Sequence, residues 1–557
     1  MSKFISRSSL GAAALLALTV AGCVDEFEPQ TSTVTGEQAS QAPGAFDNFV
    51  SGLTSTFAGQ FCYWPEKQYP FDFGYSAFFL LRDVMGQDIA IRGDWFSYWY
   101  EAVGLAPTSA ICQFPWTCYY SWVKSCNTAI SVAKADLTED KHDGLGQAYA
   151  IRAMLYMDMA QMYGAKTYAE DKNCLTVPIV SDESTIDELR SNPNATNEQI
   201  WEFILSDLDN AEKYISQDKK SADVYTPGLA FVQGLKARAY LITNDWANAE
   251  KYAKLAQEGY SVMSADEYTD WETGFNTPNN AWIFAIKFKS DDPCILLNDA
   301  DTSWGSQMCV EVDPKASGCG YAANYGQPNL IDRHLFETIP ATDCRKKCYV
   351  DFSADNLSGD ALLAKLGEYS NHPSWLENAA SATDDKTIGG LELKFRTAGG
   401  EAGRANQMIG FCLSVPVMRV EEMKLIEAEA AAWQDEARGK QLLTEFALTR
   451  DPGFEYGKHN ESYGNASTPA IINEIWWQRR VELWGEGFSM GDIKRLGKSV
   501  IRSYAGTNHK KGYQWNTNGP AEWMNLTIVQ TETNYNSACV SNPTPSAPEG
   551  DSAPYVF

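Results

Sequence analysis

The five residues Gly487-Phe488-Ser489-Met490-Gly491 match the G-x-S-x-G pattern that surrounds the nucleophilic serine of many hydrolases. That chemistry requires a strand before the serine, a helix after it and a histidine further along the chain. The residues before Gly487 have helical spacing, and the only later histidine is His509. We therefore interpret the glycines as marking a helix end, and we predict no catalytic residues and no enzymatic activity.

Charged residues of both signs follow a helical spacing in the same region. The motif comprises Arg479, Arg480, Glu482, Glu486, Gly487 and Asp492, with Arg495 beyond it. Paired carboxylates could act as acid and base, but alternating signs at this spacing more often form ion pairs between packed helices. A glycosidase needs two carboxylates about 5–10 Å apart across a cleft, and the sequence singles out no such pair. We predict a structural role for this motif.

Aromatic side chains are better candidates for ligand binding. The chain has 17 Trp and 27 Tyr, more than its core requires. Two groups lie outside the helical stripes: Trp95, Tyr98 and Trp99 in one segment, and Trp304, Tyr321 and Tyr325 in a segment rich in Gly and Asn. An exposed ring can pack against the C–H groups of a sugar while neighbouring polar groups bind its hydroxyls. The alternative for each ring is burial in the core, because Trp and Tyr bury large areas.

The spacing of apolar residues predicts a mainly α-helical scaffold to carry these groups. Residues 227–260 form a 34-residue pattern of helix, turn and helix, typical of a tetratricopeptide repeat. Companion pairs are expected at 117–163 and at 417–434 with 437–450, and a further helix is expected at 200–215. Because one pair cannot bury its apolar face alone, about four should stack into a solenoid that carries an irregular, loop-rich, ligand-binding subdomain.

The first 23 residues resemble a bacterial lipoprotein signal. A basic start precedes the short apolar stretch Leu10–Val20, and Val20-Ala21-Gly22-Cys23 resembles the lipobox, in which the cysteine thiol takes a diacylglyceryl group. About 7–15 apolar residues suit a signal sequence, whereas a spanning helix needs about 20. An ordinary secretory signal and a short membrane anchor are the alternatives. We predict cleavage before Cys23 and lipidation of its thiol.

The cysteines, histidines and net charge bear on disulfide bonds, metal binding and nucleic-acid binding. Twelve further cysteines make disulfides plausible outside the cytoplasm, with Cys309 and Cys319 able to close a loop. The absence of a CxxC pair and the scattered histidines argue against a metal site, and we expect no cofactor. The formal net charge of −27 argues against nucleic-acid binding.

Several segments resemble the SusD/RagB family of surface lipoproteins that bind nutrients in Bacteroidetes. They are Ala148–Tyr156 with Tyr163-Gly164, Ile200–Ala211, Val415–Glu422 with Ala428–Ala430, and Arg479–Gly487 followed by Asp492, Lys494-Arg495 and Gly497. The acidic residues that follow Cys23 also resemble the export signal of such lipoproteins. The resemblance extends in order from the lipobox to about residue 532.

This resemblance implies a cell-surface lipoprotein of the outer membrane that binds an oligosaccharide and delivers it to a SusC-like TonB-dependent transporter. It also implies that loops before the repeats and in the insertion contact the ligand. A peptide ligand, a surface glycan hydrolase and a pure scaffold protein are the alternatives. The expected segments are a signal peptide (1–22), a lipidated linker (23–45), an N-terminal repeat region (46–261), a loop-rich ligand-binding insertion (262–412) and a C-terminal region with the last repeat (413–557).

Overall fold

The computed structural model of the chain describes residues 44–59, 69–93, 95–218, 220–221, 223–296, 302–316, 320–324, 327–381 and 388–557. The predicted signal, Cys23, Cys319 and Tyr325 lie outside these residues. The chain divides into two compact units, one up to Asn48 and one from Phe49 onward. Helix α3 (Ala45–Ser55) begins in the first unit and ends in the second, and the remaining described helices and strands belong to the second unit.

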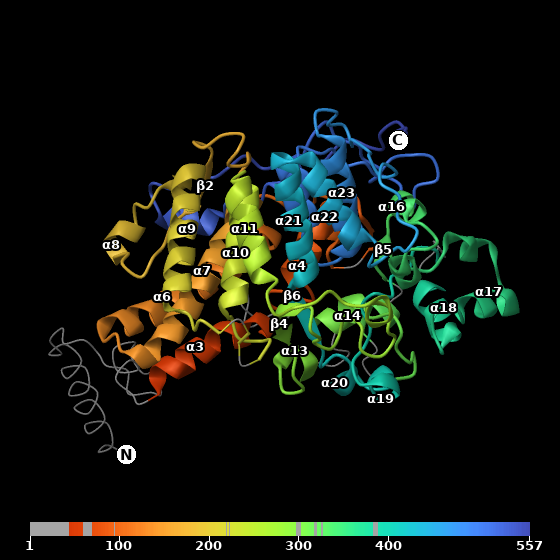
Figure 1. Ribbon diagram of the computed structural model, residues 1–557, viewed down its shortest axis with the longest axis horizontal. Helices are drawn as coiled ribbons and strands as arrows, with labels where there is room; N and C mark the ends of the chain where they lie inside the picture. The colour runs from red at the N-terminus through yellow and green to blue at the C-terminus, as the bar shows by residue number, and fades with distance from the viewer. Residues whose placement is uncertain are drawn as a thin grey trace, which may run out of the picture. The chain divides into compact units, whose positions relative to one another are not determined.

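A series of long helices forms the scaffold of the second unit. Its members are α6 (Ala110–Ala135), α7 (His142–Tyr163), α9 (Asn197–Tyr214), α10 (Leu229–Ile242), α11 (Trp246–Ala256), α21 (Val420–Gln434), α22 (Glu436–Ala447) and α23 (Ala470–Glu482). Each helix from α6 to α22 packs against the next one in this series, so that α11 contacts α21 although residues 257–419 lie between them (Figure 1). The predicted mainly α-helical, repeat-like fold is confirmed.

Local sequence explains where these helices start and how closely they pack. Thr196 caps α9 by accepting a hydrogen bond from the Gln199 N–H, while the Gln199 side chain bonds back to the cap. Asn244 adopts a positive φ of 62° in the turn between α10 and α11, and Asp245 caps α11. On α10, Gly234 leaves room for the side chain of Met418, because a Cβ there would lie 2.2 Å from the sulfur.

The described residues form three two-stranded antiparallel sheets, two of which join segments far apart in the sequence. The pairs are β1 (Ile89–Ala90) with β5 (Leu330–Ile331), β2 (Leu175–Pro178) with β3 (Asn194–Thr196), and β4 (Trp282–Lys287) with β6 (Ser414–Arg419). The β4–β6 pair closes the base of the long segment between the two strands and leads directly into α21.

The segment between β4 and β6 contains short helices and irregular backbone. Its helices are α13 (Pro293–Leu296), α14 (Trp304–Met308), α15 (Tyr321–Asn324), α16 (Arg333–Thr338), α17 (Gly359–Leu366), α18 (Pro373–Ser381), α19 (Gly400–Arg404) and α20 (Gln407–Gly410). A cluster of buried apolar side chains, including Leu330, Leu366 and Leu391, gives this segment a core of its own. The domain limits expected from the sequence stay a prediction.

The other described helices connect or terminate these parts. They are α4 (Ala77–Val84), α5 (Ser97–Tyr100), α8 (Ile186–Leu189), α12 (Ala265–Tyr268), α24 (Ser489–Arg495) and α25 (Gln530–Tyr535), with 3-10 turns at Thr56–Ala58, Glu139–Lys141, Cys344–Cys348, Phe352–Asn356 and Glu522–Met524.

No disulfide joins any two of the ten cysteines in the described part of the chain, so the expectation of disulfides is not met there. Most of them are buried and act as small apolar side chains. Burial raises the pKa of Cys126 to about 12, which leaves its thiol protonated and unreactive. Cys309 is one of these free thiols.

Candidate ligand-binding surface

The aromatic residues 95–100 form a turn followed by helix α5. The direction in which each side chain leaves the backbone decides whether its ring is buried or partly exposed. Trp95 and Tyr98 keep part of their surface, whereas Trp99 is fully buried. The Trp99 ring packs edge-on against Phe71, with 5.5 Å between the ring centroids. The prediction that Trp99 presents a ring to ligand is therefore wrong, because this side chain belongs to the core.

Trp304 requires the same correction. It begins α14 and is fully buried. Its ring meets Phe395 edge-on at 5.2 Å and Phe79 at 6.1 Å between centroids, so the insertion packs this side chain against α4. Trp304 holds the insertion in place and has no face available to a sugar.

Trp95 and Tyr321 remain as a partly exposed aromatic pair. Their ring centroids are 6.4 Å apart, with an angle of 58° between the ring planes. The β1–β5 pair, with Ile89 opposite Ile331, lies close to both residues in sequence and brings the two segments together. Tyr98 is half-buried on neighbouring α5. We call Trp95, Tyr98 and Tyr321 the aromatic surface.

Two polar atoms beside the aromatic surface lack a partner within the described structure. They are Trp95 Nε1, a donor, and Gln327 Oε1, an acceptor, and both are shielded from solvent. A Cβ built on Gly93 would lie 3.3 Å from Gln327 Oε1, which places the amide next to the segment that carries Trp95. Unpaired buried polar atoms are uncommon in folded proteins. A hydroxyl group, which both donates and accepts, could satisfy either atom.

Sequence reasoning did not single out Gln327. It lies close to Tyr325 in a segment selected only for its aromatic residues, and an isolated glutamine carries no pattern. Only the β1–β5 pairing places it beside Gly93.

The charged motif forms a buried ion-pair network. Glu482 accepts hydrogen bonds from three guanidinium groups, those of Arg345, Arg419 and Arg450, at 2.9–3.3 Å. Burial pushes the pKa of Glu482 upward, but the charges of Arg450 and Arg419 outweigh burial and hold this pKa well below its usual range. A carboxylate held in its ionised form cannot serve as a general acid.

The other members of the motif are paired in the same way. Arg479 donates to Asp492 at 2.6 Å, Arg480 pairs with Asp88 at 2.5 Å, and Glu486 accepts from Lys394 and Arg419 at 2.7 and 2.8 Å. All of these side chains are buried. The network connects α23 and α24 with β1, β6 and the insertion.

Comparison with known proteins finds similarity to SusD-like proteins. Residues 79–241 match a family model, SusD-like_3, described as starch-binding associating with outer membrane. A SusD-like protein, P38, from Formosa agariphila is 25% identical over 164 residues. That stretch is 29% of this chain and 29% of the relative, so less than a third of the relative's length is matched.

Solved structures extend the similarity to most of the chain. A SusD-like carbohydrate binding protein from Bacteroides vulgatus superposes with a TM-score of 0.67 at 18% identity, over 89% of this chain and 97% of that one. The expected SusD resemblance is confirmed: residues 79–241 are similar to this family, and the fold of the chain is that of SusD-like structures. Surface glycan-binding protein A from Bacteroides thetaiotaomicron, in complex with laminarihexaose, superposes with a TM-score of 0.59 at 17% identity, over 88% and 97%.

The G-x-S-x-G segment of this chain lacks the geometry of a hydrolase. Ser489 begins α24 and follows helix α23 and a turn rather than a strand. His509 bonds elsewhere: its Nδ1 contacts the Tyr100 hydroxyl at 2.8 Å, and its Nε2 contacts the Gln87 carbonyl oxygen at 3.0 Å. Ser489 therefore has no base supplied by this histidine.

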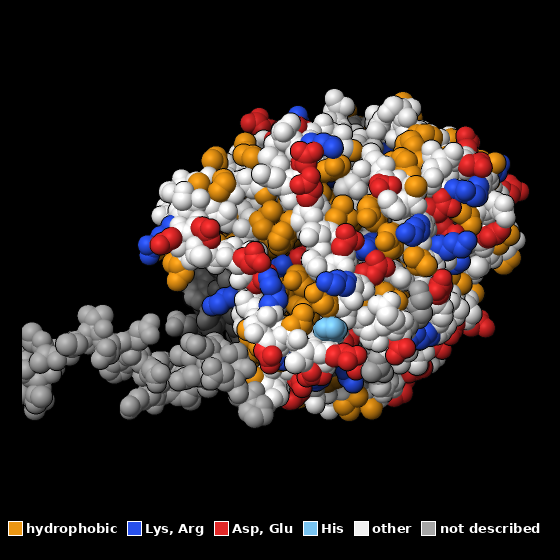
Figure 2. Space-filling model, turned by 60° about the vertical axis from the view of Figure 1, so that its left-hand side comes forward, with side chains coloured by type: hydrophobic (Ala, Val, Ile, Leu, Met, Phe, Trp, Pro, Cys, Tyr) orange, Lys and Arg blue, Asp and Glu red, His pale blue; other side chains and the backbone are white. Residues whose placement is uncertain are grey.

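Further observations concern the described residues of this chain. They contain no group of three or more His, Cys, Asp or Glu side chains arranged to hold a metal ion. None of their helices combines the length and apolar character of a membrane span. On the face shown in Figure 2, Lys and Arg side chains are interspersed with acidic ones.

Proposed function

We propose that this SusD-like protein binds an oligosaccharide at the aromatic surface, while anchored to the outer face of the outer membrane through lipidated Cys23. In this proposal it delivers the oligosaccharide to a SusC-like TonB-dependent transporter. The observation that carries the proposal is the partly exposed Trp95–Tyr321 pair with its unpaired donor and acceptor.

The chemistry of this surface suits a sugar. The apolar faces of Trp95 and Tyr321 can cover C–H groups of a pyranose ring, while Trp95 Nε1 and Gln327 Oε1 bond two of its hydroxyls. Each of these bonds would satisfy a polar atom that now lacks a partner within the described structure. The surface combines ring faces with both kinds of hydrogen-bonding group, as sugar recognition requires.

A non-enzymatic role fits the state of the charged groups. Glu482, Glu486 and Asp492 are each held by cationic side chains, and the pKa of each lies below its usual range because these cations outweigh the effect of burial. Retaining and inverting glycosidases need one carboxyl group that is protonated near neutral pH. These three acids support ion pairing rather than hydrolysis.

Isothermal titration calorimetry with purified oligosaccharides tests the proposal. Laminarihexaose and malto-oligosaccharides are the first probes, since a fold neighbour binds the former and the matching family is described as starch-binding. We expect Trp95→Ala and Tyr321→Ala to weaken binding at least tenfold, about 1.4 kcal/mol. Trp433→Ala, at a tryptophan on α21 that is 37% exposed, is the matched control and should bind normally.

Other outcomes would favour the alternatives. Binding of peptides but of no saccharide would favour a peptide-binding lipoprotein, and release of shorter sugars would favour a hydrolase. Saccharide binding that is equal in wild type, Trp95→Ala and Tyr321→Ala would remove the aromatic surface from the proposal.

A further inference from the structure

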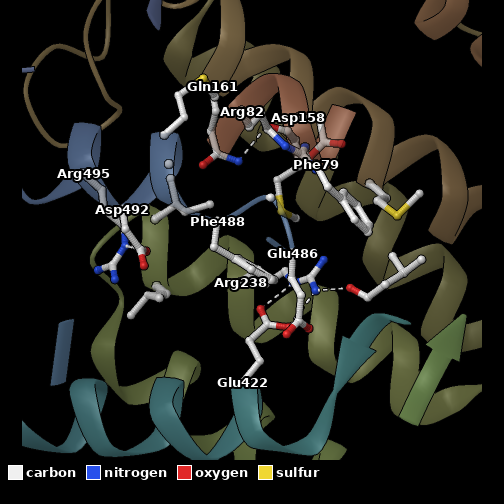
Figure 3. A pocket seen from close by; sticks show the side chains of 18 of the residues that line it. Phe79, Arg82, Asp158, Gln161, Arg238, Glu422, Glu486, Phe488, Asp492 and Arg495 are labelled. Atoms are coloured by element: carbon white, nitrogen blue, oxygen red, sulfur yellow. Dashed lines mark hydrogen bonds and ion pairs between the residues drawn. The ribbon is translucent and has the colours of Figure 1, made fainter. Parts of the chain in front are cut away.

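A pocket that shares no residue with the aromatic surface lies where helices of the repeat meet α4 and α24 (Figure 3). Side chains from α4, α7, α10, α21, α23 and α24 line it. Its empty volume is about 710 Å³, solvent at its mouth included. The part of it that a water-sized group can enter is about 60 Å³, which is room for a small molecule and not for a chain of many sugar units.

The walls of this central pocket are partly apolar and partly charged. Phe79, Met157, Leu241, Ile426 and Phe488 contribute apolar surface. Figure 3 shows Arg82 and Asp158 on one side of Phe488 and Arg238 with Glu422 on another. The pocket therefore offers a carbon skeleton an apolar wall, with polar groups on several sides.

The charges that line the pocket are already balanced. Its ion pairs are Arg82 with Asp158 at 2.8 Å, Arg238 with Glu422 at 2.6 Å, and Arg479 with Asp492 at 2.6 Å. Arg495, a fourth cation, pairs with both Asp492 and Glu429, and Glu486 is held by cations outside the pocket. An anionic or cationic ligand would add a charge that the pocket does not compensate.

Two guanidinium N–H groups in the pocket have no acceptor within the described structure. These are Arg82 Nε and Arg479 Nη1, on side chains that are only 8% and 3% exposed. Each arginine uses a different nitrogen for its ion pair, Arg82 Nη1 and Arg479 Nε. Buried donors without acceptors are rare in native structures and call for an explanation. These two donors need an acceptor atom from a ligand, and not a further negative charge.

The carboxylates of the pocket can also accept hydrogen bonds from a ligand. Asp158 accepts from Arg82 and from the hydroxyls of Tyr75 and Tyr119, and Glu422 accepts two hydrogen bonds from Arg238. A carboxylate has about four lone-pair sites, so Glu422 can accept further hydrogen bonds. A ligand that both accepts and donates fits the pocket better than one that only accepts.

We propose that the central pocket binds a small neutral polyol, no larger than a single sugar unit. Its hydroxyl oxygens would accept from Arg82 Nε and Arg479 Nη1, its hydroxyl hydrogens would reach free lone pairs of Glu422, and its C–H groups would lie on Phe79 and Phe488. The proposal does not depend on oligosaccharide binding at the aromatic surface, because no wall residue is shared.

A pocket-filling variant tests this site without breaking an ion pair. Gly491 on α24 lines the pocket, and a Cβ there would meet only the movable end of the Gln161 side chain, at 2.7 Å. Gly491→Leu should therefore enter the pocket while favouring the helix. Gly52→Leu, in α3 with no atom within 4 Å of a Cβ, is the matched control.

Saturation-transfer NMR and calorimetry would use glycerol, D-xylose, D-glucose and D-galactose as probes, with sodium acetate as the anionic comparison. We expect at least one polyol to bind wild type and Gly52→Leu, and to lose at least tenfold in affinity for Gly491→Leu. Arg479→Lys, which keeps the charge opposite Asp492 but removes Nη1, should show a similar loss. Trp95→Ala should bind the polyol normally, so failure of this site and failure of the aromatic surface are distinguishable.

Three results would overturn the proposal. The first is polyol binding that is unchanged in Gly491→Leu. The second is acetate binding to the pocket in preference to every polyol. The third is a crystal soaked with the best polyol in which only water occupies the hydrogen-bonding positions of Arg82 and Arg479.

Discussion

Arg480 on α23 and Asp88, 392 residues earlier, form a buried ion pair in which two guanidinium nitrogens contact the carboxylate at 2.5–3.1 Å. Trp484 Nε1 also donates to the Asp88 carbonyl oxygen, at 2.8 Å. Asp88 directly precedes β1, the strand that pairs with β5 and brings Trp95 close to Tyr321. The Arg480–Asp88 pair therefore stabilises the strand that holds the two halves of the aromatic surface together.

Arg480→Ala should lower the melting temperature strongly. Removing the guanidinium leaves the buried Asp88 carboxylate without its cation, which costs about 3–5 kcal/mol. Thermal melts followed by circular dichroism measure this effect. Ligand affinity should fall only as far as the folded fraction falls.

The control for this prediction is Arg438→Ala. Arg438 pairs with Glu250 at the surface, where its side chain is 45% exposed, so the pair contributes at most about 1 kcal/mol. An unchanged melt for Arg480→Ala together with abolished binding would move Arg480 into the binding site.

Trp304→Ala and Trp95→Ala should have opposite signatures. Trp304 is fully buried, so its truncation leaves a cavity and should cost about 3–5 kcal/mol of stability. Trp95 is partly exposed, so its truncation should shift the melt little and weaken saccharide binding. Calorimetric titration and thermal melts on both variants would separate the roles, and a large melting shift for Trp95→Ala without a binding defect would assign that ring to the core.

The sequence was sufficient for the helical pairs because their signals are local. The break at Thr243-Asn244-Asp245 is such a case: Asn244 takes the positive φ and Asp245 caps the next helix. The exposure of an aromatic ring is not local. Trp99 and Trp95 share one short segment, and only packing against Phe71 decides which of them is buried.

The sequence likewise could not predict which residues far apart in the chain form ion pairs with each other. The spacing of Arg480 and Glu486 indicates ion pairs but not their partners, which are Asp88 for the first and Lys394 with Arg419 for the second. The same holds for Gln327, which lies beside Gly93 because strands more than two-fifths of the chain apart pair with each other.

Cys23→Ala should abolish membrane anchoring. The thiol is the expected acceptor of the diacylglyceryl group, and several acyl chains bind a bilayer stably because each buried CH₂ contributes about 0.8 kcal/mol. Membrane fractionation should find the variant uncleaved or released, whereas Cys174→Ala, at a thiol on the folded part, should fractionate as wild type. An unmodified Cys23 in the mass spectrum of mature wild-type protein would refute the anchor.

Asp83 should make stability depend on pH near neutrality. Its carboxylate accepts from the N–H groups of Gly487 and Ser489 at 2.9 Å, which ties α4 to the start of α24. Burial, the largest influence, raises the pKa of Asp83 to about 7, although these N–H groups oppose it. In the unfolded chain an aspartate titrates near about 3.9.

The direction of the pH dependence follows from the folded and unfolded pKa values of Asp83. The folded state binds the Asp83 proton more tightly, so this contribution to stability is complete below about pH 4 and is lost as pH rises through the folded value. Between the two values, the free energy of unfolding should fall by up to about 1.4 kcal/mol per pH unit. Asp83→Asn, which cannot ionise, should remove this pH-dependent part of the free energy of unfolding. Asp136→Asn, at an exposed position, should leave it in place. Urea unfolding of the three proteins between pH 5 and 8 measures the difference, and parallel curves for wild type and Asp83→Asn would show that Asp83 does not titrate in this range.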